Sequence, residues 1–286
     1  MNKKEIWMSL KPFNWLTAAI LTLLGIFNTR MGIGMGRVTM NMFIGIPTYF
    51  SIAISGMLIA LWLKSLDEAD VSKSKDNRNI LIISSIFYTI SLGVAIFHSV
   101  VYGVGVFNLI LIILIGITWF FVIFYEKKMK NRSFLIILIN GFTFSFGFYY
   151  GAALNTWFVP FYIYLFLIAS FSLQLSKDVI RSFKVRKNQE NEKPNALIEL
   201  FGPIKTRRIA LIVQILSIIC IIIPIFLNIY NSTLYLIPML IVVLFIGIAF
   251  ILTLILKLDE KYNPVIMILL RTGVFVTFIL FLLASV

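Results

Sequence analysis

Two stretches of the chain carry acids whose type and spacing suit the binding of a metal cation. Asp67 and Asp70 are three residues apart, so on a continuing helix both carboxylates lie on one face and can reach a single ion. Asp178 follows Lys177 in a second charged stretch. The alternative for the first stretch is a solvated loop whose acids and bases cancel, and composition alone favours that alternative.

The composition indicates that these residues belong to a membrane protein. The chain has 286 residues, of which 60% are hydrophobic and 13% charged, and its mean hydropathy is +0.99. A soluble domain has about 25% charged residues, so lipid must cover much of the apolar surface here. The net charge of +13 then indicates cytoplasmic loops and anionic lipid rather than nucleic acid. The single cysteine, Cys220, excludes a disulfide framework and a cysteine-based metal site.

Nine apolar stretches are long enough to cross the bilayer as helices. About 20 apolar residues cover about 30 Å of hydrocarbon, and these stretches are too long and too uniformly apolar for the strands of a membrane barrel. The predicted spans are 13–28, 41–63, 80–98, 104–125, 134–151, 157–176, 209–230, 234–256 and 265–285. In the fifth span, Gly147 and Gly151 are four residues apart, which predicts close helix packing.

The distribution of charge predicts a cytoplasmic N-terminus and an external C-terminus. With that orientation Arg30 and Arg37 are the only bases outside, and Arg271 lies within the ninth span. All other lysines and arginines lie on the inner side, and so do all 12 acids. Acids have no topological reason to follow the bases, so we expect any chemistry on the cytoplasmic side. Two inner loops are long, residues 64–79 and 177–208.

The order of several short motifs resembles that of the UbiA-type intramembrane prenyltransferases. Lys177-Asp178 matches the start of the family's second acidic motif, K-D-x-x-D-x-x-x-D, and residues 200–205 are similar to the Gly-containing turn into its seventh helix. Residues 10–15 look like the Arg-Pro-x-Asn entry to its first helix. Residues 125–132, and the glycine-containing span after them, are similar to its fourth connection and fifth helix. The resemblance implies an all-α bundle of nine transmembrane helices, one domain over residues 1–286, with a cytoplasmic-side central cavity capped by the two long loops.

The chain departs from both acidic motifs of the family. No Asn precedes the acids of the first loop, and their spacing differs from N-D-x-x-D-x-x-x-D. In the second motif Arg181 and Val185 stand where the family has aspartates. These departures leave fewer metal ligands than the usual two-magnesium chemistry uses.

The resemblance implies transfer of an isoprenyl group from an isoprenyl diphosphate to a lipidic or aromatic acceptor, such as a glycerol ether lipid or a quinone precursor. Asp67, Asp70 and Asp178 are then the expected catalytic residues and the ligands of Mg²⁺, here of one ion. The expected substrate-binding residues are Asn14, Lys128, Lys130, Lys177, Arg181 and Arg271. For each lysine the alternative is a purely topological role in contact with anionic lipid.

Arg271 is the only charge well inside a predicted span. A charge within the bilayer is costly and is a functional candidate by default, facing a cavity of the bundle. The alternative is a side chain that extends along the helix to the inner headgroups. Asn140 and Gln174 are further polar candidates in the inner half, whereas a ligand role for His98 is not expected, since it lies at the outer end of its span.

Three classes of function remain open from the sequence. The first is an active but divergent prenyltransferase. The second is a protein of the same fold that has lost metal catalysis and binds a prenyl lipid or a partner protein, which the missing aspartates favour. The third is a small transporter with Arg271 as the counter-charge of its substrate, although the spans show no inverted symmetry.

Overall fold

The computed structural model describes residues 12–31, 33–67, 74–102, 112–113, 115–117, 119, 132–156, 158–183, 196–227, 229, 233–255 and 263–283. The regular structure in these residues is helical. The chain forms two compact units, Met1–Ile163 and Tyr164–Val286.

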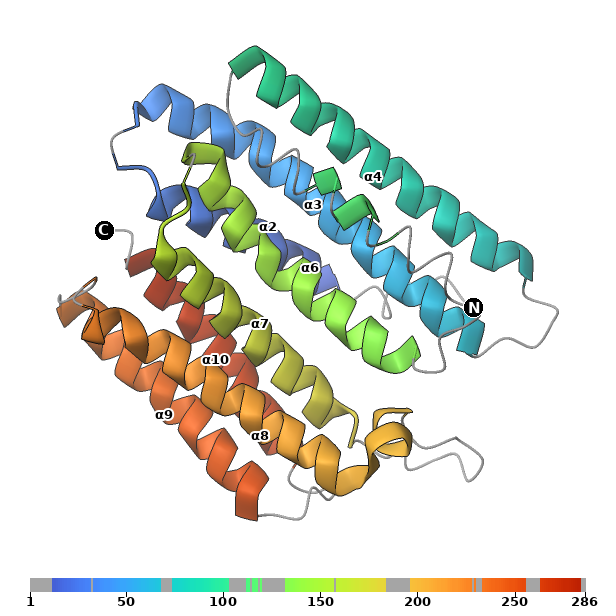
Figure 1. Ribbon diagram of the computed structural model, residues 1–286, viewed down its shortest axis with the longest axis vertical. Helices are drawn as coiled ribbons and strands as arrows, with labels where there is room; N and C mark the ends of the chain where they lie inside the picture. Colours follow the sequence, from blue (N-terminus) through green and yellow to red (C-terminus); the bar gives the residue numbers. More distant parts are fainter. Residues whose placement is uncertain are drawn as a thin grey trace. The chain divides into compact units, whose positions relative to one another are not determined.

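The first unit contains the helices α2 (Pro12–Asn28), α3 (Met35–Asp67), α4 (Ser74–Tyr102) and α6 (Arg132–Asn155). Helix α7 (Phe161–Arg181) begins at the end of the first unit and runs into the second. The second unit continues with α8 (Ala196–Phe226), α9 (Thr233–Ile255) and α10 (Asn263–Leu283) (Figure 1).

These helices coincide with eight of the nine predicted spans, and the predicted all-α membrane class is confirmed. Seven helices in the described part of the chain are long and apolar enough to cross a membrane, and α2, with 17 residues, is apolar but shorter. Most of the predicted span 104–125 lies outside the described residues.

Both long charged loops are shorter than the hydropathy pattern predicts. Helix α3 continues through Asp67 and α4 begins at Ser74, while α7 continues through Arg181 and α8 begins at Ala196. The predicted spans end at the first charged residue. A helix satisfies its own backbone hydrogen bonds, however, so it can extend beyond the apolar window into the polar interface.

Helix α8 contains a break at Gly202, which has a φ of 71° and a ψ of 160°. This left-handed conformation is costly for residues with a Cβ atom, and Pro203 next to it suits the first turn of the long helix that follows. The hydroxyl of Thr206 donates a hydrogen bond to the carbonyl oxygen of Gly202, 2.8 Å away. The predicted Gly-containing turn before the seventh span is therefore present, and a short helical segment precedes it.

Helices α2 and α6 pack closely through their glycines, as the spacing of Gly147 and Gly151 predicts. A Cβ atom on Gly151 would lie 2.0 Å from the carbonyl oxygen of Thr22, and one on Gly147 would lie 2.5 Å from that of Ala18. Gly25 on α2 meets the backbone of α6 in the same way. Only residues without a side chain allow two helix backbones to approach so closely.

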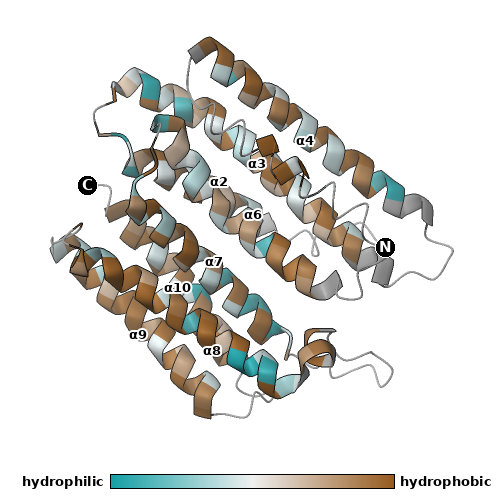
Figure 2. Cartoon of the chain, in the orientation of Figure 1, coloured by the Kyte–Doolittle hydropathy of each residue, from teal (hydrophilic) through white to brown (hydrophobic). Residues whose placement is uncertain are grey.

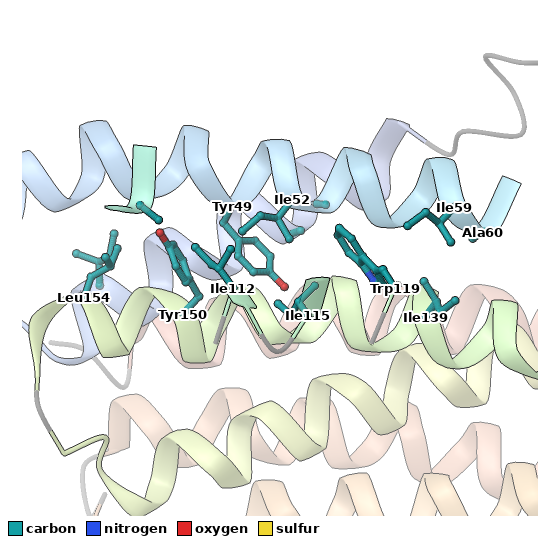
Figure 3. Close-up of a cluster of buried hydrophobic side chains, with 14 of the residues drawn as sticks. Tyr49, Ile52, Ile59, Ala60, Ile112, Ile115, Trp119, Ile139, Tyr150 and Leu154 are labelled. Atoms are coloured by element: carbon teal, nitrogen blue, oxygen red, sulfur yellow. The ribbon is translucent and has the colours of Figure 1, made fainter. Parts of the chain in front are cut away.

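The core of the first unit lies between α3 and α6 (Figure 3). The rings of Tyr49 and Tyr150 are buried there with centroids 5.3 Å apart, and the Tyr49 hydroxyl donates to the carbonyl oxygen of Thr143, 2.9 Å away. Trp119, which lies between α4 and α6 in the sequence, packs into the same core nearer the C-terminal end of α3. Each buried hydroxyl in such a core needs a partner, because lipid offers none.

Candidate active site

The C-terminal half of α7 is polar and buried. Ser172, Gln174 and Ser176 have no exposed surface, and Asp178 is 6% exposed. Hydrophilic residues gather at this end of α7 and in the N-terminal part of α8, whereas the remaining helices of the second unit are mostly hydrophobic (Figure 2). Buried polar residues are rare in membrane helices because they are costly there, and they commonly mark functional sites.

Gln174 connects Lys177 and Asp178. Its Nε2 donates a hydrogen bond to Oδ2 of Asp178, 3.1 Å away, and its Oε1 accepts one from Nζ of Lys177. The spacings of four and three residues place both partners on the face of α7 that Gln174 occupies. One amide thus orients a carboxylate and an ammonium group, which are the two charges that a metal-bound phosphate needs beside it.

A second buried amide, that of Gln214 on α8, joins three helices of the unit. Its Nε2 donates to Oγ of Ser176 on α7, 3.0 Å away, and lies 3.4 Å from Oγ1 of Thr253 on α9. Its Oε1 is buried and has no hydrogen-bond partner among the described residues. Leaving a buried acceptor unpaired costs about 1–3 kcal/mol, so this oxygen is available to a bound group that carries a donor.

Two more buried side chains in the second unit have polar atoms without a described partner. They are the hydroxyl of Ser172 on α7 and the side-chain amide of Asn263 at the start of α10, which is 2% exposed. Such groups cluster at functional sites, where a ligand or water completes their bonding.

The other half of the second unit is closed by packed aromatic rings. The ring of Phe166 on α7 stacks on that of Phe281 on α10, with centroids 4.2 Å apart, and also on that of Tyr235 on α9 at 6.5 Å. The Tyr235 hydroxyl donates to the carbonyl oxygen of Ile221, 2.9 Å away. Phe166 precedes Asp178 by about 18 Å along the helix. The unit therefore has one polar half and one apolar half.

Four of the residues predicted to form the site have described side chains. Lys177 and Asp178 lie together on α7, joined through Gln174. Arg181 is the last residue of α7 and is exposed. Arg271 is also exposed, on the stripe of α10 that carries the exposed Ile268 and Phe275. This exposure accords with the alternative in which the side chain extends along the helix to the headgroups.

The structure does not describe the side chains of the remaining predicted residues. Asp67 ends α3 and Asn14 lies in the first turn of α2, but their side chains are outside the described residues. Asp70, Lys128 and Lys130 lie outside them entirely. Their roles stay predictions.

The metal-binding capacity of the described residues is small. No three His, Cys, Asp or Glu side chains come together among them, and Asp178 is the only acid whose side chain they include. Mg²⁺ uses one or two carboxylates together with waters and the phosphates of a substrate. Asp178 therefore suits one ligand position of such an ion, with substrate phosphate supplying others.

Sequence reasoning identified Lys177, Asp178 and Gln174 but not Gln214 or Thr253. In the sequence, Gln214 could have been singled out as a polar amide within the apolar stretch 209–230. Its partner on α9 follows only from the packing of the helices.

No protein-family model matches the chain, and no curated protein matches it. Solved structures do match over almost the whole length. One, from a study of digeranylgeranylglyceryl phosphate synthase in membranes, is 18% identical, covers 97% of this chain and 96% of its own, and has a TM-score of 0.69. The apo structure of a UbiA homolog from Aeropyrum pernix K1 is 13% identical, covers 92% and 97%, and has a TM-score of 0.59.

The chain has the fold of the UbiA-type prenyltransferases, so the resemblance predicted from its motifs is confirmed at the level of the fold. Folds are shared more widely than activities, so the reaction must be argued from the site itself.

Proposed function

We propose that the protein is an intramembrane prenyltransferase that moves an isoprenyl group from an isoprenyl diphosphate to a lipidic or aromatic acceptor. The observation that carries this proposal is the buried carboxylate of Asp178, which Gln174 holds on the same helix face as Lys177. A buried acid beside a base, at one end of a helical unit whose other end is apolar, suits a reaction between a charged diphosphate and an apolar chain.

The chemistry is a substitution at the first carbon of the isoprenyl chain. The bond from that carbon to the diphosphate oxygen breaks, and its electron pair leaves with the diphosphate. A hydroxyl oxygen or an aromatic carbon of the acceptor forms the new bond and then loses a proton. Lys177 stabilises the charge that develops on the leaving group, and the apolar half of the site keeps water from the carbocation-like carbon.

Mg²⁺, when bound, neutralises diphosphate oxygens and makes them a better leaving group. The proposed ligands are Asp178 on α7 and, as the resemblance to the family's acidic motifs implies, Asp67 and Asp70. Arg181, Lys128 and Lys130 are proposed to bind the remaining phosphate charge, and Asn14 to contact substrate. The exposed Arg271, predicted from the sequence to bind substrate, is proposed instead to extend to the headgroups. In this arrangement the N-terminus is cytoplasmic, the C-terminus is external, and residues 1–286 act as one nine-helix domain.

The experiment is an assay of diphosphate release by the purified full-length protein in lipid nanodiscs. Farnesyl and geranylgeranyl diphosphate serve as donors, and a glycerol ether lipid or an aromatic quinone precursor serves as the acceptor. We expect product only with a donor, a matching acceptor and Mg²⁺. Asp178→Asn should lower the rate of diphosphate release at least tenfold, which corresponds to an increase of about 1.4 kcal/mol in the activation free energy.

The matched control is Ser182→Ala, because the Ser182 hydroxyl is buried near Asp178 but donates only to the carbonyl oxygen of Val179 on its own helix. This variant should keep its activity. Full turnover by Asp178→Asn, or by the native protein in the presence of a chelator, would contradict the proposed role of Asp178.

A second candidate is a protein that binds a prenyl lipid or a partner protein without turnover. The observation in its favour is Arg181, an exposed base at a position where the resembled motif has a metal-binding aspartate. This candidate predicts saturable binding of isoprenyl diphosphate with no product, whichever acceptor is supplied.

A further inference from the structure

Helix α4 carries a groove on the side that faces away from α3. The groove has a volume of about 550 Å³, and among the described residues it is lined by α4 alone, including Arg78, Ile82, Ser85, Ile86, Thr89 and Ile90. These residues recur every three or four positions, so they form a single helix face. Ser84, which bonds to Ser55 on α3, points in a different direction.

This face is exposed and apolar apart from one end. Ile82, Ile86 and Ile90 are each about half exposed, at 48%, 52% and 52%. In the membrane-spanning window of α4 only 17% of the residues are buried, against 72% for α3. Such a face is suited to contact with lipid chains.

Among the described residues that line the groove, the one charge is Arg78, which lies where the span begins. Arg78 is the first residue of the membrane-spanning part of α4, and the other residues that line the groove are uncharged. From Arg78 to Ile90 the helix rises about 18 Å, which exceeds half of the 30 Å of hydrocarbon. The groove therefore combines one base at the headgroup level with an apolar wall and the hydroxyls of Ser85 and Thr89.

We propose that this groove is a binding site for one membrane phospholipid with an anionic headgroup. The guanidinium of Arg78 pairs with the phosphate, since a guanidinium matches two phosphate oxygens at once. An acyl chain lies along Ile82, Ile86 and Ile90. Arg78, the one base among the described lining residues, matches a singly charged phosphodiester. The site is separate from the proposed prenyl transfer.

The test measures retained lipid and involves no turnover. The full-length protein is purified in detergent, stripped of lipid, and titrated with phosphatidylglycerol, phosphatidylcholine or diacylglycerol with identical chains, and bound lipid is counted by native mass spectrometry. We expect one tightly retained phosphatidylglycerol, weaker retention of phosphatidylcholine, and the weakest retention of diacylglycerol.

Five variants locate the site. Arg78→Gln should weaken phosphatidylglycerol retention about tenfold, the effect of losing one charge-assisted hydrogen bond, while Arg78→Lys retains part of it and Arg208→Gln, an exposed base on α8, leaves it unchanged. Ile86→Trp should obstruct the groove, whereas Ile268→Trp on an exposed stripe of α10 should not. Thermal unfolding of every variant verifies that it is folded.

Three results would overturn the proposal. The first is equal retention by Arg78→Gln and Arg208→Gln. The second is retention that survives Ile86→Trp. The third is displacement of phosphatidylglycerol by equimolar farnesyl diphosphate, which would assign the groove to the diphosphate instead.

Discussion

Gln174 donates a hydrogen bond from its Nε2 to Oδ2 of Asp178 across one turn of α7, at 3.1 Å, in a helix segment that is almost completely buried. The same amide accepts a hydrogen bond from Lys177 through its oxygen. Gln174 is thus placed to fix the orientation of the one acid whose side chain the structure describes. A buried carboxylate has given up its hydrogen bonds to water, and donors such as this amide replace them. Loss of the donor therefore destabilises the buried carboxylate.

Replacing Gln174 with Leu should impair both stability and turnover. The change leaves Asp178 without the amide donor, so we expect a loss of about 1–3 kcal/mol in the free energy of unfolding and a tenfold or greater loss of diphosphate release. Gln174→Glu keeps an acceptor for Lys177 but removes the donor to Asp178, so it should lose as much activity. Thermal unfolding and the release assay measure the two effects.

The control for this prediction is Ser170→Ala on the same helix. The Ser170 hydroxyl is buried but donates only to carbonyl oxygens of its own helix, those of Phe166 and Leu167. Its loss should leave turnover unchanged. Normal activity in Gln174→Glu would show that the donor to Asp178 has no catalytic role.

Much of the fold could be predicted from the sequence because a membrane helix is a local feature. An apolar stretch of sufficient length must form a helix in lipid, so the predicted spans and the helices coincide at α2, α3 and α6. The close approach of α2 and α6 was also predictable, since Gly147 and Gly151 remove the side chains that would prevent it. The helix ends were not, because charged residues can continue a helix beyond the hydrocarbon.

The candidate site was predictable only where its residues are close in sequence. Lys177, Asp178 and Gln174 fall within two turns of α7, and their types indicate chemistry. The contacts of Gln214 with Ser176 and Thr253 depend on how three helices are aligned along one another. Hydropathy contains no information on that alignment, so the amide in α8 was missed.

Gly151→Ala should destabilise the first unit. The added Cβ atom would lie 2.0 Å from the carbonyl oxygen of Thr22, so α2 and α6 must separate, at a cost of about 1–3 kcal/mol. Gly93→Ala on α4 is the matched control, because no heavy atom lies within 4 Å of the added Cβ, and it should stabilise the helix by about 0.5–1 kcal/mol. Thermal unfolding in detergent measures both. Equal unfolding temperatures would contradict the close packing.

Arg207→Gln should loosen the end of α9. The guanidinium donates to the carbonyl oxygens of Thr253 and Leu254, where the helix leaves its last carbonyl groups without internal partners. We expect a loss of about 1 kcal/mol in the free energy of unfolding and faster hydrogen exchange at the end of α9. Arg208→Gln, an exposed neighbour, should change neither quantity.

Gln214→Leu should separate stability from activity. The change removes a buried oxygen that has no described partner, but it also removes the bonds to the buried hydroxyls of Ser176 and Thr253. The two effects oppose each other, so the unfolding temperature should change little. Turnover should fall at least tenfold, because that oxygen is available to a bound substrate. Ser217→Ala, which removes a hydroxyl bonded to its own helix, should keep full turnover. A destabilised but fully active Gln214→Leu protein would assign Gln214 a structural role alone.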